Sequence, residues 1–294
     1  MKKAAPFFVL SAGVLWGIMG VFVRTLSGYG FSPPQIASLR IVFGAVLFLL
    51  ISAVSRRDQL KICPRDMWLF LGLGILSLLL FTVCYFTAIS MASLSVAAIL
   101  LYTSPIWVML LSALCFRESI TRRKLLAAAM AFGGCVLVSG IGSDSRLSPA
   151  VIVIGLLSAV GYGLYSIFGT VALRKYPPLT VTTYAFVFGA AGALFLCDPA
   201  GIFRIICASQ NPGQLTGLIA LTAFVTAVLP YLLYTIGLSH LSASSAAIMA
   251  SIEPVVATAA GALVFHEELT IPAVCGIALV LGAIVVLNRK TCPD

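Results

Sequence analysis

The chain has 294 residues, of which 61% are hydrophobic and only 9% are charged. Soluble proteins usually carry about 25% charged residues, so this composition excludes a soluble globular protein with a water-exposed surface. The formal net charge of +9 would suit a nucleic-acid partner, but the basic residues gather between apolar runs, which instead predicts contact with the headgroups of a lipid bilayer and no nucleic acid.

Ten apolar runs follow one another, each long enough to cross a bilayer as a helix. They lie near residues 7–26, 35–54, 67–87, 93–115, 124–140, 150–171, 180–197, 214–236, 243–265 and 272–288. The first run follows a basic head, as in a signal peptide, but large side chains fill the region of a cleavage site, so we predict an uncleaved helix. The sequence therefore predicts an all-α integral membrane protein with ten transmembrane helices and no soluble domain.

The positions of Lys and Arg predict the orientation of these helices. With the N-terminus inside, 14 of the 18 basic residues fall on the cytoplasmic side, as the positive-inside rule requires. We therefore predict a multi-pass protein of the plasma (cytoplasmic) membrane, that is, a cell inner membrane, with both termini in the cytoplasm.

The eight cysteines show no CxxC or metal-ligand spacing, so we predict neither a metal site nor a cofactor. Cys197 and Cys207 flank the predicted external loop between the seventh and eighth runs and are candidates for a disulfide.

The chain contains an internal repeat. Shifted by 149 residues, residues 85–121 lie over residues 234–270 with 13 of 37 positions identical. The matched positions include Pro105 with Pro254, Phe116 with Phe265, Glu118 with Glu267 and Thr121 with Thr270. We therefore predict two five-helix repeats, residues 1–145 and 146–294, which together form one transmembrane domain.

Because five is an odd number, the second repeat must enter the membrane inverted relative to the first. The loop FRESITRRK after the fourth run is basic, whereas the equivalent FHEELT after the ninth run has lost the basic cluster. Inverted repeats suit alternating access, in which the halves rock around a site near the bilayer midplane. The repeat thus predicts a secondary transporter.

At this point the pattern resembles the EamA branch of the drug/metabolite transporter superfamily. The resemblance covers roughly residues 7–288 and is carried by the WG of the first run, Leu39–Arg40, and the paired blocks SPIWVMLLSALCFRES and EPVVATAAGALVFHEE. It implies a basket-like bundle in which helices 1, 3, 4, 6, 8 and 9 line a central cavity. It also implies that helices 5 and 10 lie to one side, often as a homodimer contact, and that the solutes are amino acids, other small metabolites or drugs.

Glu253 is the candidate coupling or recognition residue. It lies within an apolar run, where a charge costs roughly 2.5–3.5 kcal/mol on insertion scales, and Pro254 follows it. The proline predicts a kink and a freed carbonyl; Ser104–Pro105 is the repeat equivalent, so the kink is duplicated and the carboxylate is not. Glu253 either binds a substrate amine, carries a proton, or hydrogen-bonds neighbouring serines and only steadies the kink.

Arg40 is the other embedded charge. Three roles stay open: a pair with Glu253, a bond to a substrate carboxylate or phosphate, or bonds to carbonyls that fix the outer helix ends.

Aromatic side chains recur at equivalent positions of the two repeats and predict an apolar wall with polar tips, as a small organic ligand needs. For each aromatic residue taken alone, core packing or a place in an interfacial belt is the favoured interpretation; as a symmetric set they favour the cavity. The candidate substrate-binding or coupling set is Trp16, Arg40, Tyr85, Tyr102, Tyr165, Tyr234, Ser251 and Glu253.

We predict a transporter of small organic metabolites that exports amino acids or related compounds by alternating access, with Glu253 as a candidate for proton coupling. An importer or facilitator of the same fold is the alternative. An intramembrane enzyme or a channel is disfavoured, because HExxH, GxGD and GxSxG are absent from the sequence, and we predict no catalytic residue.

Overall fold

The computed structural model describes residues 2–55, 60–140, 148–196 and 198–288, and within these ranges the chain is helical, with no strand. Two short 3₁₀ turns, η1 and η3, and two π-helical segments, η4 and η5, accompany the α-helices. In chain order the elements are η1 (Lys2–Ala4), α1 (Ala5–Gly17), α2 (Met19–Gly28), α3 (Pro33–Ser55), η3 (Pro64–Asp66), α4 (Met67–Leu71), η4 (Gly72–Leu79), α5 (Leu80–Met91), α6 (Leu94–Leu101), α7 (Ser104–Phe116), α8 (Arg122–Ser139), α9 (Pro149–Ala172), α10 (Pro178–Leu196), α11 (Pro199–Ala208), α12 (Pro212–Ala223), η5 (Phe224–Val228), α13 (Leu229–Leu238), α14 (Ala243–Ala250), α15 (Glu253–Phe265) and α16 (Ile271–Asn288).

Nine helical segments of the described ranges are long and apolar enough to cross a membrane. They coincide with nine of the ten predicted runs, which confirms a multi-pass helical membrane protein. The remaining run, 124–140, is covered by α8, but the first turn of α8 carries Arg122, Arg123 and Lys124. Its apolar stretch is therefore shorter than that of its neighbours, and ten spans stay a prediction.

The predicted loop between the seventh and eighth runs contains a helix that the sequence analysis did not identify. The Asp198 carboxylate accepts a hydrogen bond from the Gly201 amide and so caps α11. Apolar residues of α11 pack against Leu215 and Ile219 of α12. Cys207 at its end is an exposed free thiol, whereas Cys197 lies outside the described residues, so the disulfide stays a prediction.

Polar residues at helix ends define where the apolar helices begin. Among the described residues, five hydroxyl side chains at helix starts accept a hydrogen bond from the amide three residues later, which satisfies one of the amides that the first turn leaves unpaired. They are Ser93, Thr121, Ser148, Ser242 and Thr270. Such caps matter in lipid, because no water is present there to solvate a free amide.

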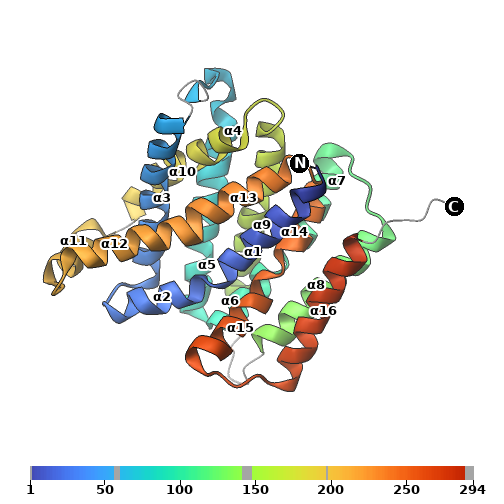
Figure 1. Cartoon of the computed structure of the whole chain (residues 1–294). Helices are drawn as coiled ribbons and strands as arrows, with labels where there is room; N and C mark the ends of the chain where they lie inside the picture. Colours follow the sequence, from blue (N-terminus) through green and yellow to red (C-terminus); the bar gives the residue numbers. More distant parts are fainter. Residues whose placement is uncertain (1, 56–59, 141–147, 197, 289–294) are drawn as a thin grey trace.

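Helices of the first half of the chain pack against helices of the second half in matching pairs. α1 packs against α13, and α9 packs against η4 and α5. α3 and α10 pack against each other, with the rings of Phe48 and Phe186 5.0 Å apart. α8 and α16 form a separate pair at one side of the bundle (Figure 1). Their close approach depends on Gly134 and Gly276, since a Cβ on either would lie 2.7 or 2.6 Å from the other's carbonyl oxygen. The homodimer contact through this pair stays a prediction.

The two ends of the bundle are packed differently. At the end that holds the N-terminus, α14 packs on α7; at the opposite end, α6 and α15 do not pack on each other to a comparable extent (Figure 1). These two helix pairs are equivalent under the 149-residue shift. The bundle is therefore closed at the N-terminal end and more open at the other.

Candidate functional site

Two spans are interrupted near their middle, and the candidate site lies at these breaks. α6 ends at Leu101 and α7 begins at Ser104; α14 ends at Ala250 and α15 begins at Glu253. Pro105 and Pro254 occupy the first turn of α7 and α15, where the missing amide costs the helix that begins there no hydrogen bond. Each proline thus ends the preceding helix and starts the next one, so the expected kink is a two-residue break.

Glu253 is the first residue of α15, where the helix dipole favours a carboxylate. α1 crosses this break closely, because a Cβ on Gly17 would lie 2.7 Å from the Glu253 carbonyl oxygen and 2.5 Å from the Val256 Cβ. Among the described residues, no hydrogen bond or ion pair reaches the Glu253 carboxylate. The carboxylate is thus held at mid-span without the serine hydrogen bonds that a purely structural role would need.

A small cavity of about 10 Å³ lies between the two breaks. Residues of both breaks line it, together with one residue of α9. They are Leu101, Tyr102, Ser104, Pro105, Tyr162, Ala247, Ala250, Ser251 and Glu253. The predicted site residues Tyr102, Ser251 and Glu253 therefore do lie together, and we call this space the break cavity.

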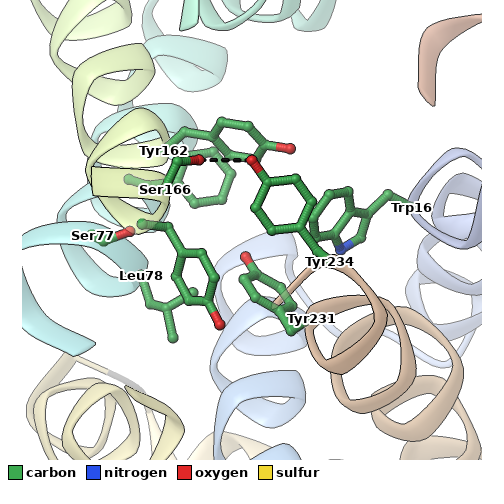
Figure 2. Close-up of a pocket in the computed structure, with 9 residues that line it drawn as sticks. Trp16, Ser77, Leu78, Tyr162, Ser166, Tyr231 and Tyr234 are labelled. Atoms are coloured by element: carbon green, nitrogen blue, oxygen red, sulfur yellow. Dashed lines mark hydrogen bonds between the residues drawn. The ribbon is translucent and has the colours of Figure 1, made fainter. Parts of the chain in front are cut away.

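An aromatic cluster adjoins the break cavity. The Trp16 ring lies 5.2 Å from the ring of Tyr231, 5.5 Å from that of Tyr234 and 6.1 Å from that of Tyr162. Figure 2 shows these rings facing one another from three helices. Tyr165 also belongs to the cluster, with its ring 5.1 Å from that of Tyr231, and its hydroxyl lies 3.0 Å from Thr235 Oγ1. We call the space that these rings enclose the aromatic chamber.

The aromatic chamber has a volume of about 10 Å³, and Tyr162 forms a wall of both it and the break cavity. Ser77, Leu78, Phe81 and Ser166 complete its lining. The Tyr234 hydroxyl lies 2.7 Å from Ser166 Oγ, as the dashed line in Figure 2 marks. Ligand sites usually enclose 300–1,000 Å³, so the helices around this chamber must separate before a metabolite fits.

Arg40 lies at the far side of the aromatic chamber. Its Nε donates to Thr226 Oγ1 and its Nη2 donates to the Thr226 carbonyl oxygen, both at 2.8 Å. Thr226 belongs to the π-helical segment η5, whose wider turn leaves a carbonyl available to an outside donor. Arg40 makes no ion pair with Glu253, although its charge acts on that carboxylate.

A third cavity, of about 60 Å³, is lined by Arg40 and Tyr85 and shares Leu78, Phe81 and Tyr231 with the aromatic chamber. The three cavities thus form one row from Glu253 to Arg40. Every predicted candidate residue lines one of them. The resemblance implied that the first, third, fourth, sixth, eighth and ninth spans line the cavity. The structure adds the second span, α3, through Arg40.

The sequence analysis missed several lining residues. Ser104 was noted only as the equivalent of Glu253, although it lines the break cavity. Ser166 follows Tyr165 directly and lies one turn after Tyr162, a helical spacing that would have indicated it. Phe81 and Ser77 carry no such signal in an apolar run.

The closed end of the bundle is held by polar contacts between α7, α8 and α14. Glu118 follows α7 and accepts a hydrogen bond from Lys124 Nζ at 2.5 Å and further hydrogen bonds from Ser112 and Ser244. Burial alone would raise the pKa of Glu118, but the hydrogen bonds from Lys124, Ser112, Ser244 and Ser242 outweigh it and lower the pKa to about 2. Glu118 is therefore ionised and joins the two halves of the chain.

Its repeat equivalent behaves differently at the other end. Glu267 pairs with Arg24 at 2.6 Å, and both side chains are about half exposed, at 50% and 54%. The residue before each glutamate, Arg117 or His266, has a left-handed backbone with φ of 54° or 55°. The two turns thus share a conformation, while only Glu118 is enclosed by the opposite half.

Comparison with known proteins identifies the family. The sequence model of the EamA-like transporter family matches residues 3–140 and 149–289. Two proteins of Archaeoglobus fulgidus, each named an uncharacterized transporter, are 31% and 30% identical over 99% of this chain and over 100% and 98% of their own lengths. A protein crystal structure superposes with a TM-score of 0.80 at 18% identity, covering 98% of this chain and 97% of its own, and therefore shows the same fold. The chain belongs to the EamA-like transporter family, within the drug/metabolite transporter superfamily.

Proposed function

We propose that this transporter moves small organic solutes across the plasma membrane by alternating access of two inverted halves, residues 1–145 and 146–294. The observation that carries the proposal is the difference between the two ends of the bundle. α14 and α7 are packed together, whereas their repeat equivalents α6 and α15 are not. Two similar halves could form either of two equivalent contacts, one at each end of the bundle. A structure in which only one of them is formed corresponds to one of two alternating states.

Several matched features support the inverted halves. The helix breaks, the left-handed turns and the π-helical segments recur after 149 residues: residues 75–79 of η4 correspond to η5. The backbone contacts at the breaks recur as well, since α9 lies over Ser104 at Gly163 as α1 lies over Glu253 at Gly17. Features this specific are expected if one five-helix unit was duplicated.

The charge distribution supports both termini in the cytoplasm. Arg117 and Lys124 follow α7 at the closed end, near the N-terminus, whereas the acidic Glu267 and Glu268 follow α15 at the open end. With the positive-inside rule, the closed end faces the cytoplasm. The proposed state is therefore open toward the outside.

The lining of the cavities supports an amino acid or a related metabolite as the solute. The aromatic chamber offers ring faces to an apolar side chain. Arg40 uses two of its five donors on Thr226, and the others suit a solute carboxylate. Glu253 lies at the opposite end of the row, where it meets either a solute amine or a coupling ion. We propose export as the direction, with import as the alternative outcome of the assay below.

The test is transport by purified protein in proteoliposomes loaded with a mixed pool of amino acids and metabolites, with and without an imposed pH gradient. Native protein should release a subset of the pool. Trp16→Ala, which removes the centre of the aromatic chamber, should lower that flux at least about tenfold, the equivalent of about 1.4 kcal/mol of lost contact.

Trp68→Ala is the matched control. Trp68 is 56% exposed and contacts Phe168 outside the three cavities, so its loss should leave the flux nearly unchanged. Equal effects of the two substitutions would contradict a solute site in the aromatic chamber. Uptake from outside by native protein, without release, would reverse the proposed direction.

A further inference from the structure

We propose that the break cavity is a sodium-ion site, formed by the Glu253 carboxylate and the hydroxyl groups of Ser104 and Ser251. The inference goes beyond transport of an organic solute, because ion binding can be measured when no solute is present. The proposed sodium ion would be a partner for the Glu253 carboxylate on the side away from Arg40.

The two serines are the first observation. Ser104 is 4% exposed and Ser251 is 5% exposed, and neither hydroxyl has a hydrogen-bond partner among the described residues. Among the described residues, every side-chain oxygen that is fully buried has a hydrogen-bond partner. Because the two serine hydroxyls have none, neither oxygen is fully buried, so both border open space. The open space that both residues line is the break cavity. A polar group buried this deeply without a partner costs about 1–3 kcal/mol, which a bound ion would offset.

The backbone supplies further oxygen atoms. Pro105 and Pro254 have no amide hydrogen, so the carbonyl groups four residues earlier, at Leu101 and Ala250, lose their helical partner. In the second break the Ser251 and Ile252 amides bond carbonyls only three residues back. Leu101 and Ala250 both line the cavity. Unwound backbone at broken membrane helices is a recurrent source of ligands for coupling ions.

Charge and size select a small monovalent cation. The cavity of about 10 Å³ accommodates one water-sized particle. Its polar side chains offer only oxygen, which hard cations prefer, and only one carboxylate. One carboxylate balances one positive charge, while Arg40 is engaged with Thr226 in another cavity.

The position of the ion would link it to the solute. Tyr162 is a shared wall of the break cavity and the aromatic chamber, and its ring packs on Trp16 at 6.1 Å. An ion that fixes the two breaks also fixes the surface on which the solute would lie. Binding of one should therefore favour binding of the other.

The experiment is thermal unfolding of purified protein in detergent, in sodium, potassium or choline chloride at equal ionic strength. A ligand that binds only the folded state raises Tm with its concentration. Native protein should show a saturable rise in Tm in sodium relative to choline, larger than that in potassium. Glu253→Gln should abolish the sodium-dependent rise, and Ser251→Ala or Ser104→Ala should require about tenfold more sodium, as loss of one ligand worth about 1.4 kcal/mol implies.

Controls separate ion binding from general effects on stability. Glu267→Gln changes a half-exposed glutamate far from the break cavity and should keep the full sodium-dependent rise, as should Ser239→Ala at an exposed turn. The quantity compared is the difference between sodium and choline within each variant, so a variant with altered stability is still informative.

Three results would overturn the proposal. One is the same Tm for native protein in all three salts; another is a sodium-dependent rise that survives Glu253→Gln. The third is a Tm that follows pH and ignores sodium, because Glu253 then carries a proton. Failure of the flux assay with a normal sodium response would reject the solute site and leave the ion site standing.

Discussion

Glu118→Gln tests whether the polar contacts at the closed end of the bundle hold that end closed. The Glu118 side chain is 15% exposed, and its hydrogen bonds lower its pKa from the ordinary 4.5 to about 2. Opening releases the hydrogen bonds from Ser244 and Ser242, which belong to the second half. Lys124 and Ser112 belong to the first half and stay with Glu118. The pKa of Glu118 then rises part of the way toward its ordinary value. The hydrogen bond from Ser244 to the ionised Glu118 is worth about 1.5–3 kcal/mol in favour of the closed end, or at most about 100-fold in the ratio of closed to open molecules.

This contribution has a defined pH dependence. Because the pKa of Glu118 is lowered in the closed state, its stabilisation is complete above pH about 4.5 and is lost as the pH falls toward 2. At neutral pH the substitution Glu118→Gln removes the charge without acid. Glutamine keeps one acceptor oxygen for the serines, so the value of about 100-fold is an upper limit.

The assay is a distance measurement between spin labels at Ile120 and Ser239, two exposed positions at the closed end, after removal of the other accessible cysteines. Glu118→Gln should shift the distribution from a short to a longer distance. Glu267→Gln, which breaks a half-exposed pair worth at most about 1 kcal/mol, should leave it unchanged. A distribution unaffected by Glu118→Gln would refute the reasoning.

Three other predictions follow from the same packing. Ser95 and Glu267 are the repeat equivalents of Ser244 and Glu118, which are in contact at the closed end. If the halves alternate, cysteines that replace Ser95 and Glu267 should cross-link only in molecules closed at the outer end. Cross-linking of every molecule would contradict alternation. Gly17→Ala should destabilise the fold by about 1–3 kcal/mol in denaturant unfolding, because its Cβ would overlap α15, whereas Gly20→Ala, with nothing within 4 Å, should not. Arg40→Lys should lower Tm, since lysine cannot make the two directed bonds to η5; an unchanged Tm would show that these bonds contribute little.

The parts of the site that could be predicted were those with a local cause. Pro254 forbids a helical hydrogen bond whatever its neighbours are, so the break beside Glu253 follows from two adjacent residues. The break therefore needed only helical geometry. The grouping of Trp16 and Tyr234 rested instead on the family resemblance, which implied that the first and eighth runs line one cavity.

The parts that were missed depend on contacts between distant segments. Arg40 bonds Thr226, 186 residues away, through a carbonyl that only the π-helical turn of η5 exposes. No periodicity in an apolar run marks a π turn. α11 was missed for another reason: it is short and amphipathic and lies in a segment that had been treated only as a connection between two spans.

The divergence of the two repeats at the break cavity has an electrostatic reason. Position 104 carries a serine where its equivalent, 253, carries a glutamate, and both residues line a cavity of about 10 Å³. Two carboxylates this close in a low-dielectric interior cannot both remain ionised, so a fully symmetric site would hold a permanent proton. In the proposed sodium site, one carboxylate opposite two hydroxyl groups keeps a single negative charge that one small cation would neutralise. Under the proposed mechanism, the symmetry of the scaffold would let the two halves exchange positions, while the asymmetry of this one pair would provide a charge that the cavity exposes to either side.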